Sequence, residues 1–210
     1  MRKGCVIVET REIHDLYDII QNKHMKFIPK SWGLTMFLSE KNKHLVTAEM
    51  FDREVDIRIL PSDKMSIQDY NILLTSIDFW TGIHYDKTLV FQTDSQILRE
   101  GINDFLEFSY IGARWSFSPY VGNGGFSLRD NSIMQEILKQ KPYDPFTDGN
   151  EDVYFAHRVK SVGGFLATPE QADSFSVESF FGFGSLGCHA IQKWLSKEDC
   201  KKILTQYERE

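Results

Sequence analysis

Short apolar runs alternate with amphipathic segments along the chain, and several of the runs stop abruptly on polar residues. Residues 5–8, 32–38, 88–92 and 110–112 are runs of the kind that form interior strands, and 55–60 alternates apolar and charged positions like an edge strand. Apolar residues recur at helical spacing in 12–24, 66–80, 131–140, 150–162 and 196–208, while 96–108 is helical or mixed. The early order strand, helix, strand predicts a βαβ unit with parallel strands.

Composition narrows the class of protein without naming its chemistry. The chain has 210 residues, 41% hydrophobic and 26% charged, which is the profile of an ordinary globular domain. Its net charge of −6 argues against a nucleic-acid partner, for which a basic face is expected. Three cysteines without paired spacing indicate free thiols in a reducing compartment. The chain shows no leader pattern and no apolar run of about 18 residues, so we expect a cytoplasmic protein without a membrane span.

Polar clusters follow two of the predicted strands. Glu9-Thr10-Arg11 ends the first, and Gln92-Thr93-Asp94 ends the run 88–92. In open α/β sheets ligands bind just beyond the carboxyl ends of the strands, so Asp94 stands where a ligand or a metal ion would meet a charge. The alternative is that Asp94 and Ser95 merely end the strand or cap a following helix. No G-x-G-x-x-G follows the first strand, which argues against a dinucleotide-binding domain.

Three further features could complete a site, and each has a plain structural alternative. Gly124 and Gly125 either let a sugar or phosphate approach the backbone or form a tight turn that needs positive φ. Glu151-Asp152 is either a positioned general base or an acidic pair at a helix start. His189 is either a metal ligand, in a mixed nitrogen and oxygen set suited to Mn²⁺, or a structural histidine.

Taken together, the motifs resemble the GT-A fold glycosyltransferases that use a nucleotide-sugar donor. The stretches that carry the resemblance are V-I-V-E-T-R (6–11), D-Y-N-I-L-L (69–74), F-Q-T-D-S (91–95), Y-I-G-A-R-W (110–115), G-N-G-G-F-S-L-R (122–129), N-E-D-V-Y-F (150–155), F-S-V-E (175–178) and G-C-H (187–189). The resemblance implies an α/β, GT-A-like (Rossmann-like) open mixed sheet, mostly parallel and flanked by helices. We expect one such domain over residues 1–210, cut from a longer chain. The set is most similar to a bacterial and viral group, including the N-terminal domain of a larger chlorella-virus protein, which implies a host cytoplasm.

The resemblance also implies a metal site. Asp94 matches the last carboxylate of the family's D-x-D motif, which binds a divalent cation on the donor diphosphate. His189 matches the C-terminal histidine that completes the metal shell. Gln92 replaces the first Asp of the motif, so only one carboxylate is left for the metal. The implied cofactor is Mn²⁺ or Mg²⁺.

The remaining roles are also implied by position. Asp152, with Glu151 before it, matches the E-D pair that supplies the catalytic base in inverting members and holds sugar hydroxyls in retaining ones. The donor-binding positions are Thr10 and Arg11 at the base, Tyr70 and Asn71 against the nucleoside, Gln92, Thr93 and Asp94 at the diphosphate, and Gly124 and Gly125 over the sugar.

The leading hypothesis is a metal-dependent hexosyltransferase that moves a sugar from a UDP-sugar donor to a carbohydrate acceptor. The alternative is a non-catalytic nucleotide-sugar or carbohydrate-binding module, with Trp115, Phe180 and Phe183 as stacking platforms. A metal-dependent hydrolase or nucleotidyltransferase would need two metal carboxylates close together, and Gln92 argues against it. The sugar, the acceptor, the stereochemical course and the oligomeric state stay open.

Overall fold

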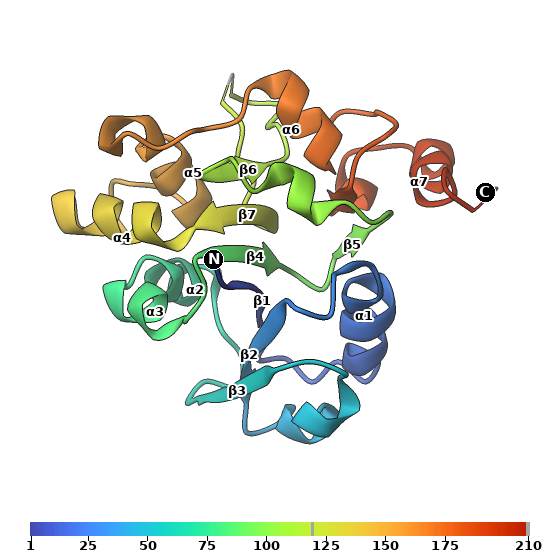
Figure 1. Ribbon diagram of the computed structural model, residues 1–210, viewed down its shortest axis with the longest axis horizontal. Coiled ribbons are helices and arrows are strands. Elements are labelled where there is room, and N and C mark those ends of the chain that lie inside the picture. The colour runs from blue at the N-terminus through green and yellow to red at the C-terminus, as the bar shows by residue number, and fades with distance from the viewer. Residues whose placement is uncertain (119, 209–210) are drawn as a thin grey trace.

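A six-stranded sheet runs through the middle of the molecule in this computed structural model, which describes residues 1–118 and 120–208 (Figure 1). Its strand order is β3-β2-β1-β4-β7-β6. The bounds are β1 (Lys3–Val8), β2 (Gly33–Ser39), β3 (Val55–Leu60), β4 (Lys87–Phe91), β6 (Tyr110–Gly112) and β7 (Phe126–Asp130). The first four strands of this order pair in parallel, and β7 runs antiparallel to both β4 and β6. The predicted open, mostly parallel sheet is therefore confirmed.

The apolar runs form interior strands because both faces of the sheet are covered. Every residue of β2 and β4 is buried, while β3, which alternates apolar and charged residues, is the edge strand that this pattern predicts. β1 lies between β2 and β4 and is parallel to both. The carboxyl ends of β1 and β4 consequently lie side by side, and both polar strand ends face the same edge of the sheet.

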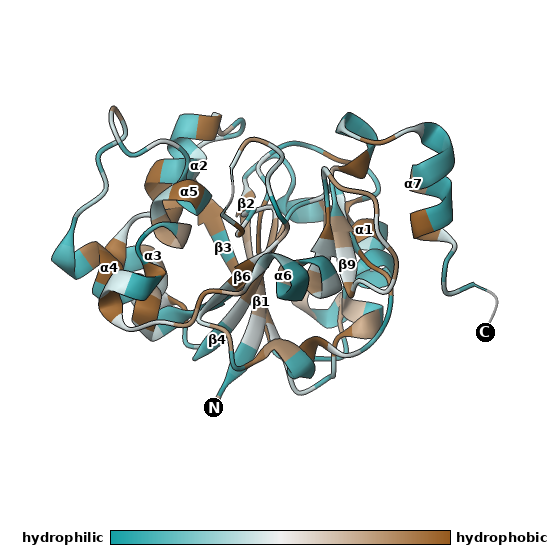
Figure 2. Cartoon of the chain, turned by 90° about the horizontal axis from the view of Figure 1, so that it is seen from above, coloured by the Kyte–Doolittle hydropathy of each residue, from teal (hydrophilic) through white to brown (hydrophobic). Residues whose placement is uncertain are grey.

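Helices cover the two faces of the sheet unequally. α2 (Ile67–Leu74), α3 (Ile77–Gly82), α4 (Asn131–Gln140) and α5 (Glu151–Ala156) gather on one face, and α1 (Leu16–Lys23) lies on the other, as two perpendicular views agree (Figures 1 and 2). α6 (Pro169–Phe175) packs on β6, and α7 (Lys197–Leu204) lies at the periphery. None of the helices in the described ranges has the length and apolar character needed to cross a bilayer.

A second, three-stranded sheet ties the last third of the chain to the end of β4. It has the order β5-β9-β8, with bounds β5 (Ser95–Ile97), β8 (Ser176–Val177) and β9 (Gly187–His189). β5 pairs antiparallel with β9, so Ser95 lies opposite His189. This pairing brings two residues that are distant in sequence to one edge of the main sheet.

Several element boundaries differ from the sequence-based prediction. The single helix expected over 66–80 is two helices, because the chain turns at Thr75 and the Ser76 side chain caps a new start by accepting from the Asp78 amide at 3.2 Å. The segment 96–108, expected to be helical or mixed, is mixed and contains no α-helix: it begins in β5 and continues in a 3₁₀ turn over Ile102–Phe105. The α-helices expected over 12–24 and 150–162 are also shorter.

The C-terminal helix begins as predicted, because Ser196 accepts a hydrogen bond from the Asp199 amide at 3.1 Å. The part of the predicted charged segment at 209–210 lies outside the described residues. The three cysteines are all free and buried, as expected for unpaired thiols.

Candidate active site

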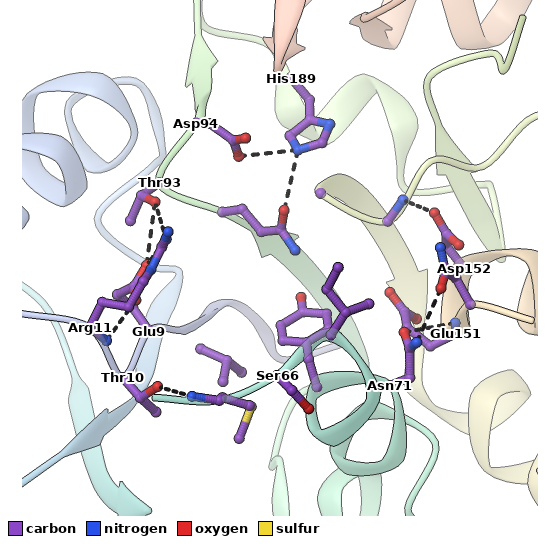
Figure 3. A pocket seen from close by; sticks show the side chains of 18 of the residues that line it. Glu9, Thr10, Arg11, Ser66, Asn71, Thr93, Asp94, Glu151, Asp152 and His189 are labelled. Carbon is purple, nitrogen blue, oxygen red and sulfur yellow. Dashed lines mark hydrogen bonds and ion pairs between the residues drawn. The ribbon is translucent and has the colours of Figure 1, made fainter. Parts of the chain in front are cut away.

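A cavity of about 660 Å³ opens at the shared carboxyl edge of β1 and β4. Its size lies within the range of about 300–1,000 Å³ that is typical of ligand pockets. Every candidate site residue from the sequence lines this cavity: Thr10, Arg11, Tyr70, Asn71, Gln92, Thr93, Asp94, Gly124, Gly125, Glu151, Asp152 and His189. The labelled side chains surround one space, with Glu9–Arg11 across from Asn71, Glu151 and Asp152, and with Asp94 beside His189 (Figure 3).

One side of the cavity is the strand-end turn, which we define as Glu9–Arg11. The guanidinium of Arg11 donates to both carboxylate oxygens of Glu9, at 2.8 and 2.6 Å, and reaches Thr93 Oγ1 at 3.3 Å. The Thr10 hydroxyl accepts from the Met65 amide at 2.9 Å, so it ties the turn to the segment that precedes α2. Arg11 is still exposed on one side, which leaves its cation available to a ligand.

A buried asparagine holds the strand-end turn in place. Asn42 Nδ2 donates to the carbonyls of Glu9 and Arg11 at 2.8 and 2.9 Å, and its Oδ1 accepts from the Ser39 amide at 2.8 Å. The sequence analysis missed Asn42, because it lies in a polar stretch, 39–43, that has the composition of an ordinary surface loop. Its complete burial is the feature that reveals its role.

The second side is formed by Gln92, Asp94, Glu178 and His189, a group that we call the metal corner after the metal site that the motif resemblance predicts here. Nε2 of His189 lies 3.2 Å from Asp94 Oδ1 and 3.3 Å from Gln92 Oε1. Its Nδ1 lies 3.3 Å from Glu178 Oε1. One imidazole nitrogen, one carboxylate oxygen and one amide oxygen thus converge, while a second carboxylate orients the ring from behind, as the outer partners of metal-bound histidines do.

Charge at the metal corner is strongly coupled. Burial by itself lowers the pKa of His189, but its hydrogen bonds to Asp94 and Glu178 outweigh burial and raise that pKa to about 9. Burial raises the pKa of Asp94, yet the contacts with His189 and Lys193 more than offset it and hold the pKa well below its usual range. Within residues 1–118 and 120–208, no three His, Cys, Asp or Glu side chains are arranged to hold a metal ion by themselves.

A lysine that the sequence analysis did not single out completes this corner. Lys193 Nζ lies 2.9 Å from Asp94 Oδ2 and lines the cavity. The chain reverses direction at Ala190, which has a left-handed backbone (φ 48°), and its amide donates to the Asp94 carbonyl at 2.9 Å. A non-glycine residue in this region is strained by about 1–2 kcal/mol. The turn returns Lys193 to Asp94, where it adds a cation beside the single motif carboxylate.

The third side carries the acidic pair at the start of α5, and its two members have different environments. Glu151 is buried, and both its carboxylate oxygens accept from Arg129, at 2.5 and 2.9 Å. Arg129 is itself completely buried beneath aromatic rings, with the ring centroid of Tyr110 at 4.9 Å. Glu151 is therefore committed to an internal ion pair and does not offer a free oxygen to a ligand.

Asp152 has the environment of a functional carboxyl group. Its Oδ2 accepts from the Gly124 amide at 3.0 Å, and its Oδ1 accepts from the Val153 amide at 2.8 Å. Burial, helped by the charge of Glu151, raises the pKa of Asp152 to about 6. A carboxyl group with a pKa near the working pH is well matched to general acid-base chemistry.

Gly124 and Gly125 are required because other side chains lie close to their Cα atoms, and not because of their backbone conformation. Gly124 and Gly125 do lie in a turn, but neither has positive φ, so the alternative that this turn needs positive φ is wrong for these two positions, although Gly122 does have φ of 128°. A methyl group at Gly125 would overlap the imidazole ring of His189. One at Gly124 would overlap Glu151 and approach the Asp152 Cβ to 2.8 Å. The two glycines allow the metal corner and the acidic pair to lie against the same loop.

The alternative that Asp94 and Ser95 cap a helix is also wrong, because β5 begins at Ser95. The Ser95 hydroxyl donates to the Gln92 carbonyl at 2.6 Å and lies 2.9 Å from Nε2 of the buried His24. Burial lowers the pKa of His24 to about 4, so this histidine is neutral at physiological pH. Ser95 and His24 thus support the turn that presents Asp94.

Solved structures similar to this one are glycosyltransferases. The apo-form glycosyltransferase GlyE of Streptococcus pneumoniae TIGR4 matches with a TM-score of 0.55 and 12% identity over 94% of this chain and 55% of that one. The mannosyltransferase PcManGT of Pyrobaculum calidifontis, in complex with GDP-Man and Mn²⁺, matches with a TM-score of 0.50 and 12% identity over 82% of this chain and 56% of that one. The chain thus spans about half the length of these proteins. The likeness confirms the GT-A-like fold predicted from the sequence.

Sequence comparison gives the family. No curated protein matches the chain. The family model described as "Protein of unknown function (DUF5672)" matches residues 54–189, a range that begins at the edge strand and ends on the histidine of the metal corner. Since this match covers well over half of the chain, the protein belongs to the DUF5672 family.

Proposed function

We propose that the protein is a metal-dependent glycosyltransferase that moves a sugar from a nucleoside-diphosphate donor, UDP-sugar, to a carbohydrate acceptor. The observation that carries the proposal is the convergence in one cavity of the metal corner and of Asp152, a half-buried carboxyl group whose pKa is raised to about 6. A cation-binding corner stabilises a diphosphate leaving group, and a carboxylate with raised pKa accepts the proton of an attacking hydroxyl.

The nucleoside end of the donor lies, in this proposal, between the strand-end turn and α2. Arg11 and Thr10 stand at the end of β1, and Tyr70 and Asn71 face them from α2 across the cavity. The exposed guanidinium offers hydrogen-bond donors to a base or a phosphate. Asn71 is fixed in turn, because its Oδ1 accepts from the Glu151 amide at 3.1 Å.

The diphosphate lies at the metal corner. Asp94, Gln92 and His189 would hold a divalent cation such as Mn²⁺ or Mg²⁺ through a carboxylate oxygen, an amide oxygen and an imidazole nitrogen, which are ligands that these ions accept. His189 is protonated without the metal, so the cation would have to displace the proton on Nε2. The cation, when bound, neutralises charge that develops on the departing diphosphate. Lys193 adds a second positive charge beside Asp94, which compensates for the small number of protein ligands around the cation.

The transfer step is a substitution at the anomeric carbon of the donor sugar. The acceptor oxygen forms the new bond to that carbon, and the bond from the carbon to the β-phosphate oxygen breaks, with its electron pair leaving on the nucleoside diphosphate. We assign Asp152 the role of the base that takes the hydroxyl proton. Glu151 positions the start of α5 through its ion pair with Arg129 and does not itself react.

The comparison with PcManGT supports a nucleotide-sugar donor and a divalent cation, because that protein holds GDP-Man and Mn²⁺. That the donor nucleotide is UDP is a prediction from the motif resemblance, and so is the viral origin of the protein. Titrating UDP and GDP against the chain in parallel decides which base the strand-end turn accepts.

The first test is isothermal titration of UDP with and without Mn²⁺. We expect micromolar binding, about −8 kcal/mol, only when the metal is present. Asp94→Ala should abolish that binding, while Asp104→Ala, which removes an exposed carboxylate outside the cavity, should not change it. Metal-dependent binding that persists unchanged in Asp94→Ala would refute the assignment of the metal corner.

A second variant distinguishes an enzyme from a binding module. Asp152→Asn should keep donor binding and lose transfer of the sugar to an acceptor, measured as release of nucleoside diphosphate. Asn keeps the size and one oxygen of the side chain but cannot accept the proton. Full turnover in Asp152→Asn would exclude Asp152 as the base, and donor binding without any turnover in the wild type would favour the non-catalytic module.

A further inference from the structure

A second hollow of about 140 Å³ opens next to the donor cavity. Asn123, Asn150 and Asp152 line both spaces, so the proposed base stands on the boundary between them. A hydroxyl group of a molecule bound in the second hollow can therefore reach Asp152, which also borders the donor cavity. The volume of the second hollow is well below the range of about 300–1,000 Å³ for pockets that enclose whole ligands. A hollow of this size suits a single ring of a larger molecule.

Aromatic side chains form one wall of this hollow. The rings of Trp115 and Phe117 are nearly parallel, with centroids 5.8 Å apart and an interplanar angle of 27°. Trp115 itself is only 5% exposed and supports Phe117 from within the fold, whereas Phe117 is 71% exposed and Trp194, which also lines the hollow, is 51% exposed. The face of an aromatic ring carries partial negative charge and attracts positively polarised hydrogen atoms. A pyranose ring presents such C–H groups on its apolar face, so these side chains form a platform for a sugar.

Polar groups with acceptor character line the rest of the hollow. Glu178 Oε1 accepts from Asn123 Nδ2 at 3.1 Å, and Oε2 makes no hydrogen bond within residues 1–118 and 120–208. Ser179 and Asn150 add further groups that bind hydroxyls. The hollow contains the carboxyl groups of Glu178 and Asp152, and no lysine or arginine is among the described residues that line it. Glu178 is paired with His189, but both carboxyl groups can still accept from hydroxyl donors, and these lining residues offer no lysine or arginine to a carboxylate.

We propose that this hollow is the acceptor subsite, and that it takes one neutral hexose ring stacked on Phe117 and Trp194, with the buried Trp115 packed against Phe117, while excluding uronic and sialic acids. The inference rests on the proposed function in assigning the occupant as the acceptor. The platform and the absence of cations specify the chemical class: a neutral glycan whose terminal ring enters the hollow, with the rest of the molecule in solvent.

The test is nuclear magnetic resonance of the tryptophan side chains, with no donor or metal added. The chain has four tryptophans, two of which, Trp32 and Trp80, are fully buried. Methyl glucoside, methyl galactoside and methyl mannoside are titrated against the ¹⁵N-labelled protein. At least one of these glycosides should shift the indole N–H signals of Trp115 and Trp194 saturably at millimolar concentration. The signals of Trp32 and Trp80 should not shift. Methyl glucuronide, which differs from the glucoside by one carboxylate, should cause no shift.

Two results would overturn the proposal: no neutral glycoside shifts the signals of Trp115 and Trp194, or the glucuronide shifts them as much as the glucoside does. Phe117→Ala and Trp194→Ala should each weaken glycoside binding by about 2- to 12-fold, the equivalent of one aromatic contact. Phe146→Ala, which removes a side chain that is 90% exposed and lines neither space, is the matched control and should bind as the wild type does.

The design separates this inference from the proposed function. UDP titration with Mn²⁺ on the same samples reports on the donor cavity alone, and Phe117→Ala should leave that binding unchanged. Glycoside shifts in a protein that binds no nucleotide would disprove the proposed transferase and support only a neutral-sugar site. Nucleotide binding without glycoside shifts would disprove the acceptor subsite and leave the donor site standing.

Discussion

Replacing Glu151 by Gln tests how the buried ion pair supports the active-site wall. The side chain of Arg129 is 0% exposed and that of Glu151 is 4% exposed, and the two share hydrogen bonds of 2.5 and 2.9 Å. Glu151→Gln keeps the volume and one oxygen acceptor but removes the countercharge. The guanidinium then stays buried among aromatic rings without compensation.

The magnitude follows from the burial of both partners. Breaking a buried ion pair by removing one partner typically costs about 3–5 kcal/mol. Because Gln keeps one hydrogen bond, we expect the lower end of that range, about 3 kcal/mol of unfolding free energy. For a chain of this size, each kcal/mol lowers the melting temperature by about 2–4 °C, so the loss should be about 6–12 °C.

Urea denaturation followed by circular dichroism measures this loss, with an unchanged m-value showing that the same surface unfolds. The double variant Arg129→Met with Glu151→Gln removes the uncompensated charge and places a polarisable side chain among the rings, so it should be more stable than Glu151→Gln alone. Glu198→Gln breaks an exposed pair with Lys202 and serves as the control, with no change in midpoint. The reasoning is refuted if Glu151→Gln loses less than about 1 kcal/mol or if the double variant is the less stable of the two.

Three further predictions concern the site. The folded-state pKa of Asp152 is raised to about 6, so the proposed base is a carboxylate above that pH. The kcat/KM for sugar transfer should therefore rise with pH and reach a plateau above pH 6. A flat profile from pH 5 to 8 would contradict the assignment of Asp152. Gly125→Ala places a methyl group in the metal corner and should remove Mn²⁺-dependent UDP binding, whereas Gly182→Ala, where the nearest side-chain atom would be 3.9 Å away, should bind UDP normally by the same titration. Asn42→Ala leaves two carbonyls of the strand-end turn without their hydrogen-bond donor. It should lower the free energy of unfolding by about 1–3 kcal/mol and weaken UDP binding. A variant with unchanged stability and unchanged affinity for UDP would show that the turn keeps its conformation without Asn42.

The sheet could be predicted from the sequence because its strands carry the signal locally. β1 and β4 each end in a short apolar run, residues 5–8 and 89–91, and each run stops on polar residues that become part of the cavity wall. β5 could not be predicted, because it is three residues long and is defined by pairing with β9. A strand of that length is too short to show a period-two pattern.

The same distinction separates the site residues that were expected from those that were missed. Asp94 and Asp152 follow recognisable strand ends and helix starts, so their positions in the cavity could be expected. Asn42, Lys193 and Arg129 could not, because nothing in their local sequence shows that Asn42 is buried, that Lys193 turns back to Asp94, or that Arg129 pairs with an acidic residue of α5. Those facts depend on contacts between distant segments, which a single sequence does not display.

The pairing of β9 with β5 has a consequence for when the protein becomes active during its synthesis. Six segments spread over most of the chain must meet before the cavity exists, and β9, the strand that carries His189, is made long after β5, with which it pairs. Contacts of such large sequence separation form slowly, because a long loop must close first. A nascent chain that has passed Asp94 but not His189 can build the parallel strands while lacking a complete metal corner. A nucleotide and a metal ion would then bind only the fully folded protein, and their binding would stabilise the folded state relative to the incomplete one.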